Sequence, residues 1–294
     1  MKRVLNMGSL NIDHVYAVPH ISRPGETLAS TSYTVHAGGK GANQSAALAR
    51  AGAQVFHAGR LGPQSEWLEE KLAGLGCDMR YTVRGETPTG HAIIQVDSHG
   101  QNSIVLYPGA NHQLERGDID EAISEFNESD ILLLQNEIND IPYIIEQAKK
   151  RQIPICLNPA PFTASVLEYP LEAIDLLVFN QTEGQGLSAQ EEPQAMLETL
   201  ASRYPDTRLL LTLGADGLYY RAGDEAFFVA ASPVKAVDTT AAGDTFIGFF
   251  LAELLRGCPP DQAATHASQA AALSVTRPGA MDSIPHREEI SPSA

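Results

Sequence analysis

Short apolar runs alternate with helical patterns along most of this 294-residue chain. Runs such as DILLLQNE, IDLLVFNQ and RLLLTLG are typical of buried strands, and amphipathic stretches such as IPYIIEQAKKRQ and PQAMLETLASRYP separate them. Strands that are apolar almost throughout and alternate with helices indicate a parallel sheet covered on both faces. The pattern predicts one α/β domain over residues 1–294, with three layers (αβα) and a mostly parallel central sheet.

Two stretches, at about residues 14–37 and 89–108, interrupt this alternation. Neither has a helical period, and TGHAIIQVDSHGQNSIVLY reads as two strands around an HGQN turn. We expect the two stretches to form a small antiparallel sheet inserted into the α/β body. Such a sheet is either a lid that excludes water from a site or a β extension that only covers an edge, and the residues leave both open.

The charge and the cysteine content exclude several classes of protein. The net charge of -16 and the pI of about 4.9 give an average surface that repels phosphate backbones, so we expect no nucleic-acid partner. No apolar run approaches the roughly 18 residues of a membrane span, and we expect no membrane partner. Cys77, Cys156 and Cys258 are far apart and in no C-x-x-C pair, which indicates free thiols and a cytoplasmic protein.

A glycine-rich segment, AGGKGANQSAALARAGA at 37–53, leads into an alanine-rich helical stretch. It lacks the G-K-S/T ending of a P-loop and the third glycine of the dinucleotide fingerprint, so neither standard nucleotide loop fits. The segment combines small residues that admit a ligand with polar residues that could bind one, namely Gly38, Gly39, Gly41, Lys40, Asn43 and Gln44. A ligand loop and a tight strand-to-helix connection are equally consistent with it.

A second segment, KAVDTTAAGDTFIGFFLAELL at 235–255, predicts a helix with an anion hole at its start. The small residues Ala241, Ala242 and Gly243 leave their amides unobstructed there. Asp244 follows in the first turn, where a carboxylate ordinarily stabilises a helix by about 0.3 to 1 kcal/mol. Amides for a phosphoryl charge and a carboxylate for a hydroxyl proton are the two requirements of phosphoryl transfer, which favours a catalytic role for Asp244.

These two segments resemble the signatures of the ribokinase-like, or PfkB, family of carbohydrate kinases. GSLNID, PGAN, NPAP, NQTE, TLGADG and VTRPGAMDSIP also occur in the family's order, so the resemblance spans nearly the whole chain. Within the family the chain is most similar to the ribokinases. The resemblance implies an ATP-dependent sugar kinase that converts D-ribose and ATP to D-ribose 5-phosphate and ADP. The alternatives are a kinase of the same fold for deoxyribose, a ketohexose or a nucleoside, and a non-catalytic sugar or nucleotide sensor.

The resemblance also implies roles for individual residues. Asp244 would be the general base, and the amides of residues 241–244, those of Ala242 and Gly243 above all, would form the anion hole. Sugar-binding positions would be Asn11, Asp13, Gly39, Lys40, Gly41, Ala42, Asn43, Glu137 and Asp244. ATP-binding positions would be Asn180, Glu183, Thr212, Leu213, Gly214, Ala215, Asp216, Gly217, Gly243 and Ser268.

The same resemblance implies two cations and a homodimer. Glu183, with Asn180 in the family's N-x-x-E motif, would organise Mg²⁺, partly through water. An activating K⁺ would lie at Asp238, Thr240, Ser274, Arg277, Gly279 and Ser283. The dimer would form through the β lid, whose edge strands are otherwise exposed. The wider family usually has glycine at position 241, although the ribokinases share the alanine.

Other conspicuous residues receive no functional role. The nine histidines show no paired metal-binding spacing such as H-x-x-x-H, so we expect them in the core or on the surface. The single tryptophan, Trp67, lies in the amphipathic stretch SEWLEEKL and is expected to pack into the core.

Overall fold

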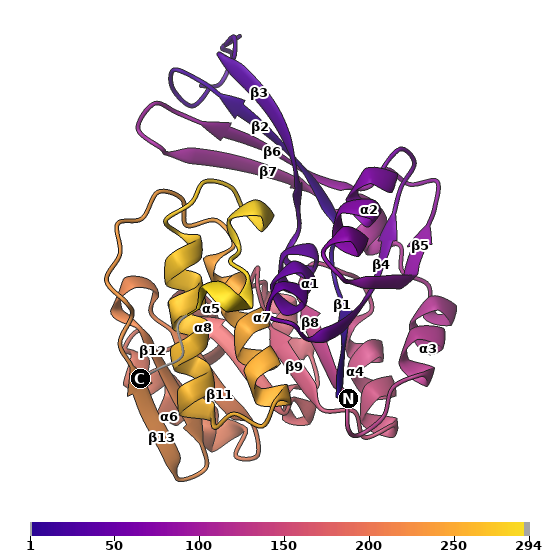
Figure 1. The fold of residues 1–294 in the computed structure, drawn as a ribbon, viewed down its shortest axis with the longest axis vertical. Coiled ribbons are helices and arrows are strands. Elements are labelled where there is room, and N and C mark those ends of the chain that lie inside the picture. Colours follow the sequence, from indigo (N-terminus) through magenta and orange to yellow (C-terminus); the bar gives the residue numbers. More distant parts are fainter. Residues whose placement is uncertain (1, 291–294) are drawn as a thin grey trace.

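The computed structural model describes residues 2–290, and its largest element is a nine-stranded sheet (Figure 1). In spatial order its strands are β13 (Glu225–Val229), β12 (Leu218–Ala222), β11 (Arg208–Thr212), β10 (Leu176–Asn180), β9 (Ile155–Asn158), β8 (Ile131–Gln135), β1 (Arg3–Met7), β4 (Gln54–Leu61) and β5 (Asp78–Arg84). The strands from β11 to β5 pair in parallel, and β12 and β13 add an antiparallel hairpin at one edge. The predicted mostly parallel sheet is confirmed.

Helices cover both faces of this sheet, as predicted (Figure 1). One face packs against α1 (Lys40–Arg50), α2 (Glu66–Gly74), α7 (Ala242–Leu255) and α8 (Pro260–Ser274). The other face packs against α3 (Arg116–Ser124), α4 (Ile141–Lys150), α5 (Gln181–Ser188) and α6 (Pro193–Arg203). Because successive strand side chains point to opposite faces, Val4 joins the first core and Leu5 the second. The fold therefore has three layers.

Among residues 2–290, six short 3-10 turns complete the regular structure: Gly109–His112, Ala164–Glu168, Leu171–Ala173, Gly214–Asp216, Met281–Ser283 and Arg287–Glu289. Within the described range, no helix has the length and apolar character needed to cross a membrane. The prediction for Trp67 is wrong, because 36% of its surface is exposed on α2 while Leu68 and Leu72 form the buried side of that helix.

A separate four-stranded sheet projects from the body (Figure 1). Its order is β3 (Ser32–Gly38), β2 (Asn11–Ala17), β6 (Gly90–Val96) and β7 (Asn102–Tyr107). The outer pairs are antiparallel, and the central pair, β2 and β6, is parallel. The inserted sheet is thus where we expected it, although β2 begins earlier, so that Asn11 and Asp13 lie on a strand of the projecting sheet.

The carboxyl ends of the parallel strands meet the base of this projecting sheet. Gly8 follows β1, Glu137 follows β8, and Asn158, Asn180 and Thr212 end β9, β10 and β11. Crevices outside the carboxyl ends of parallel strands are the usual ligand sites of α/β folds. The candidate site residues from distant parts of the sequence are therefore gathered at one edge.

Candidate active site

The glycines of the first segment allow its backbone to approach neighbouring strands closely. Gly39, which precedes α1, has a φ of +92°, a left-handed conformation that favours glycine. A Cβ at Gly41 would lie 2.4 Å from the Ser9 nitrogen, and one at Gly38 would lie 2.1 Å from Asp13 Oδ2. These glycines thus seat α1 against the end of β1 and leave room for the Asp13 carboxylate.

Backbone groups of this segment are largely used within the protein. The Gly41 amide donates to Ser9 Oγ at 3.2 Å, and the Ala42 amide donates to the Ser9 carbonyl at 2.9 Å. The Lys40 amide donates to Glu137 Oε2 at 3.0 Å. Side chains of the segment, and not its amides, are therefore the groups available to a ligand.

Two carboxylates lie where the resemblance places the sugar. Glu137 accepts hydrogen bonds from the Lys40 amide and the Ser9 hydroxyl, and burial raises its pKa. Burial, with a contribution from the Glu137 charge, raises the pKa of Asp13 to about 6. Asn11 is buried beside them, and its Oδ1 accepts from Asn111 Nδ2 at 2.7 Å. Acceptors and donors suited to sugar hydroxyls thus gather at the base of the projecting sheet.

Asp244 is buried in the first turn of α7, where both of its oxygens are held by α1. Asn43 Nδ2 donates to Oδ2 at 3.1 Å, and Gln44 Nε2 donates to Oδ1 at 2.9 Å. Ala241 precedes the helix with a φ of +61°, which explains why glycine suits this position. No side chain in the described part of the chain caps this turn. The amides at the start of α7 thus lie next to a positioned carboxylate.

The start of α7 lines a cavity of about 230 Å³. The lining includes Ala242, Gly243, Asp244 and Lys40. A Cβ at Gly243 would meet no atom within 4 Å, so this turn faces open space. The Ala242 amide makes only a long hydrogen bond, 3.3 Å, to the Thr239 carbonyl. The cavity has the size and the donors to admit a phosphoryl group beside the carboxylate.

Lys40 supplies positive charge between the two ends of this site. Burial acts to lower its pKa, but the charges of Asp244, Glu137 and Glu183 outweigh this effect and raise it. The lysine therefore stays protonated among three carboxylates from α7, the end of β8 and α5. An ammonium in this place can bind an anion that lies between the sugar residues and α5.

Asn180 and Glu183 line the same cavity and form the capping box of α5. Asn180 Oδ1 accepts from the Glu183 amide at 2.9 Å, and Glu183 Oε2 accepts from the Asn180 amide at 2.9 Å. Burial raises the pKa of Glu183. Each carboxylate oxygen keeps a lone pair beyond its Asn180 contact, so this donor set fits a hard cation such as Mg²⁺ held partly through water.

Comparisons with known proteins agree with this arrangement. The model of the pfkB family of carbohydrate kinases matches residues 1–287. The chain belongs to this family. It is 38% identical over 303 residues to the ribokinase of Haemophilus influenzae, covering 98% of this chain and 97% of that protein. The protein is thus a sugar kinase, a phosphotransferase with an alcohol group as acceptor.

Two further relatives of this carbohydrate kinase bear on its substrate. The deoxyribokinase of Salmonella typhimurium is 30% identical over 294 residues, covering 96% of this chain and 95% of that protein. The structure of Arabidopsis thaliana ribokinase complexed with ribose and ATP has a TM-score of 0.86 and 29% identity, covering 99% of this chain and 98% of that one.

The predicted ATP-binding positions lie only partly in the cavity. Asn180, Glu183, Thr212 and Gly243 line it, whereas residues 213–217 and Ser268 are not part of its lining. Residues 213–217 form the turn between β11 and β12, and Ser268 is buried in α8. Four of the predicted ATP-binding positions thus line the cavity, and the others do not.

Two of the predicted cation positions, Thr240 and Gly279, contact Asp238. Its Oδ1 accepts from the Thr240 amide at 2.9 Å and its Oδ2 from the Gly279 amide at 2.9 Å. Burial would raise the pKa of Asp238, but these hydrogen bonds lower it. The hydroxyls of Ser274 and Ser283 donate to carbonyls of their own segments and keep their lone pairs. Arg277 pairs with Glu289, so this position can offer only its backbone oxygen to a cation.

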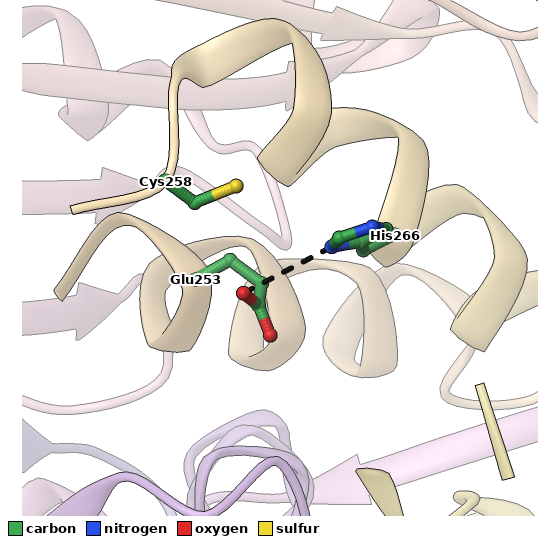
Figure 2. Close-up of side chains that lie close together, drawn as sticks. All are labelled: Glu253, Cys258 and His266. Atoms are coloured by element: carbon green, nitrogen blue, oxygen red, sulfur yellow. Dashed lines mark ion pairs between the residues drawn. The ribbon is translucent and has the colours of Figure 1, made fainter. Parts of the chain in front are cut away.

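Another group of potential metal ligands lies near the end of α7, away from this cavity. Figure 2 shows Glu253, Cys258 and His266, whose ligand atoms lie within 4.8 Å of one another. His266 Nδ1 is 3.9 Å from Glu253 Oε2, but Glu253 Oε1 accepts from Arg256 at 2.8 Å and from Arg287 at 3.4 Å. Since two guanidinium groups already compensate this carboxylate and would repel a divalent cation, we interpret the group as an ion-pair network that ties α7 to α8 and to residues 287–289.

Three residues of the site, Ser9, Asn111 and Asn158, carried no predicted role, and Gln44 was expected only as a polar residue that could bind a ligand. Ser9 bonds to Glu137, Asn111 bonds to Asn11, and both Gln44 and Asn158 belong to the polar group around Asp244. The signal for all four was present, because Ser9 lies in GSLNID, Asn111 ends PGAN, Asn158 begins NPAP and Gln44 ends GGKGANQ. The Asn11–Asn111, Gln44–Asn158 and Gln44–Gln135 contacts each join residues that are 91 or more positions apart in the sequence. Spacing alone could therefore not reveal these roles.

Proposed function

We propose that this carbohydrate kinase is a ribokinase, which transfers the γ-phosphoryl group of ATP to the primary hydroxyl of D-ribose and releases D-ribose 5-phosphate and ADP. The observation that carries the proposal is the place of Asp244. Its carboxylate accepts hydrogen bonds from Asn43 and Gln44 of the glycine-rich segment 37–53. It lies in the first turn of α7, which lines the cavity of about 230 Å³. The similarity to ribokinases, one of them complexed with ribose and ATP, supports the choice of ribose.

In the proposed reaction, Asp244 removes the proton of the sugar hydroxyl as its oxygen attacks the γ-phosphorus. The bond from that phosphorus to the bridging oxygen of ATP breaks, and ADP takes the electron pair. The amides of Ala242 and Gly243 donate hydrogen bonds to the phosphoryl oxygens on which negative charge develops, and Lys40 adds a positive charge nearby. Asn43 Oδ1 is a buried acceptor without a hydrogen-bond partner among residues 2–290, which suits a sugar hydroxyl as donor.

We assign the remaining sugar contacts to Asn11, Asp13 and Glu137, and the ATP contacts to the turn at 212–217, Ser268, Asn180 and Glu183. Glu183 would organise Mg²⁺ through water, and bound Mg²⁺ would neutralise charge on the phosphates. K⁺ would bind near Asp238 and backbone oxygens of the 274–283 segment, beside the start of α7. Lower turnover after replacement of K⁺ by a large organic cation checks this site.

Deoxyribose is the second candidate substrate, because the relative from Salmonella typhimurium is a deoxyribokinase. The decisive measurement is ADP release across ribose, deoxyribose, ketohexoses and nucleosides, ranked by kcat/KM. Ribose should rank first. A higher rank for deoxyribose would replace ribose in the proposal, and no ADP release with any of these acceptors would contradict the kinase reaction itself.

Asp244→Asn tests the base directly. The amide keeps the size of the side chain and cannot accept the hydroxyl proton, so we expect kcat to fall by at least about 100-fold. Sugar binding, measured by calorimetry, should weaken much less. Turnover within a few fold of the wild type would contradict the assignment of Asp244 as general base.

We further propose that residues 1–294 act as one kinase domain and that two chains form a homodimer through the projecting sheet, which would serve as a lid over the sugar. A cytoplasmic location fits the supply of ATP and three free thiols, Cys77, Cys156 and Cys258.

A further inference from the structure

We infer that Gln44 positions the catalytic carboxylate and that a buried relay of amide side chains determines which way the Gln44 amide faces. The inference rests on the proposed function, because it takes Asp244 as the base. Gln44 lies fully buried in α1, and its Nε2 donates to Asp244 Oδ1 at 2.9 Å. Asn43 contacts only the other oxygen, Oδ2. Each oxygen of the base thus has its own amide donor.

A glutamine can hold a carboxylate only with its nitrogen, so the orientation of its amide matters. Gln44 Oε1 accepts from Gln135 Nε2 at 2.7 Å, and the same nitrogen donates to Asn6 Oδ1 at 2.9 Å. Asn6 Nδ2 then donates to the Gly41 carbonyl at 2.7 Å. A backbone carbonyl can only accept, so it fixes Asn6, and Asn6 and Gln135 in turn fix Gln44.

A second anchor acts from the other side of Gln44. Asn158 Nδ2 donates to the Val178 carbonyl at 2.9 Å, which leaves its Oδ1 to accept from Gln44 Nε2 at 3.3 Å. The Gly41 carbonyl of α1 and the Val178 carbonyl of β10 therefore impose the same orientation on the Gln44 amide. In both routes the nitrogen of Gln44 faces Asp244 and its oxygen faces away.

This arrangement leaves one buried polar atom of Gln135 unpaired. It is fully buried, and its Oε1 has no hydrogen-bond partner among residues 2–290. An unpaired buried acceptor costs about 1–3 kcal/mol. Reversal of the amide would not remove this cost, because Oε1 would then face the acceptor oxygens of Asn6 and Gln44. Gly8 makes the arrangement possible, since a Cβ there would lie 2.1 Å from Gln135 Oε1.

The charged groups that act on Asp244 come from three elements. They are Lys40 of α1, Glu137 after β8 and Glu183 of α5. The donors from Asn43 and Gln44 are neutral. Loss of the Gln44 donor should therefore change how the Asp244 carboxylate is held and leave the charge of the site unchanged.

Two substitutions test the relay. Gln44→Met keeps the volume and removes the donor, so kcat should fall by at least about tenfold while the KM for sugar changes little. Gln135→Met touches no substrate and removes the donor that holds Gln44 Oε1, so the Gln44 amide can reverse and turn an acceptor toward Asp244. We expect a loss of kcat that is smaller than for Gln44→Met, because Asn158 still contacts Gln44. In both variants the KM for sugar should change little.

Thr207→Val is the matched control. Thr207 is buried, and its hydroxyl donates to the Ile174 carbonyl at 2.8 Å far from Asp244. This variant should lower the melting temperature and leave kcat and KM unchanged. An active wild type with unchanged kcat in Gln44→Met would overturn the inference, even if Gln135→Met fails to fold. Failure of the proposed function is distinct, because the wild type itself would then release no ADP.

Discussion

At the scale of single residues, the site combines carboxyl groups whose ionisation the fold makes unfavourable. Asp13 is the clearest case. Its pKa lies near 3.8 in an exposed chain and rises to about 6 in the fold, chiefly because of burial. Between these values the folded state binds more protons than the unfolded state, so this residue makes the protein less stable as the pH rises from 4 to 6. The carboxylate is retained at the expense of stability.

Asp13→Asn should therefore stabilise the sugar-free protein at pH 8 by on the order of 1 to 3 kcal/mol, and the gain should vanish as the pH falls below 4. The same variant should raise the KM for sugar, because a carboxylate acceptor is lost. Urea unfolding across this pH range measures the first effect, and steady-state kinetics measures the second. Asp206→Asn, at an exposed position, should change neither. A gain that is larger at pH 4 than at pH 8 would contradict the sign.

The roles of some residues could be predicted from local sequence and others could not. Asp244 and the small residues before it were recognisable, because an anion hole and a base next to it occupy four consecutive positions. Gln135 was not, because it ends an ordinary buried strand and its partners Asn6 and Gln44 are 129 and 91 residues away. The sequence pattern of a strand gives little indication that one of its polar side chains is buried by contacts with distant residues.

At the scale of elements, the contact between α1 and α7 brings the base to its donors. A Cβ at Gly248 would lie 2.4 Å from Ala47 Cβ and 2.8 Å from the Leu48 nitrogen, so the two helices meet backbone to backbone at this point. Gly248 is one turn after Asp244, as Ala47 is after Asn43. The spacing of the helices at this glycine therefore determines the spacing of Asp244 from Asn43 and Gln44.

Gly248→Ala should push the helices apart, lower the stability by about 1 to 3 kcal/mol and reduce kcat. Denaturant unfolding and ADP release measure these two effects. Gly117→Ala in α3, where an added Cβ meets nothing within 4 Å, should leave kcat unchanged and should not lower the stability. Wild-type stability and kcat in Gly248→Ala would show that the helix contact tolerates the methyl group.

The element pattern was well predicted where periodicity was strong. Long apolar strands and amphipathic helices such as β8, β10 and α4 lie where the sequence pattern indicated. Elements with mixed polarity, such as β5, β13 and α3, gave no comparable signal, because they are half exposed. The parallel pairing of β2 with β6 could not be predicted, since it joins strands from two separate insertions.

At the scale of the whole molecule, the projecting sheet leaves an apolar face exposed. Tyr33, Val35, Ile93, Val105 and Tyr107 are all at least 43% exposed, and their registers place them on one side of the sheet. Asp13 lies on the opposite side, since it neighbours His14 in the strand. Exposed apolar patches with free strand edges favour association, and a second copy of this lid is the partner we propose.

Light scattering should give twice the 31.6 kDa mass of the chain at working concentration. Val105→Glu should reduce it toward the single-chain mass, because this side chain is 65% exposed in one chain and a charge there opposes burial. Phe228→Glu, an equivalent change at a position 48% exposed on β13, should leave the mass unchanged. A single-chain mass for the wild type would contradict the dimer.

Asn11 and Asp13, which we propose as sugar contacts, lie on β2, and this strand continues into the projecting sheet that we propose as a lid. A sugar that binds them therefore also selects among lid positions, and the apparent affinity equals the intrinsic affinity multiplied by the fraction of molecules whose lid is already competent. Substitutions at the distant end of the lid that lower this fraction would thus weaken the apparent affinity for sugar. A saturating concentration of sugar would overcome the effect.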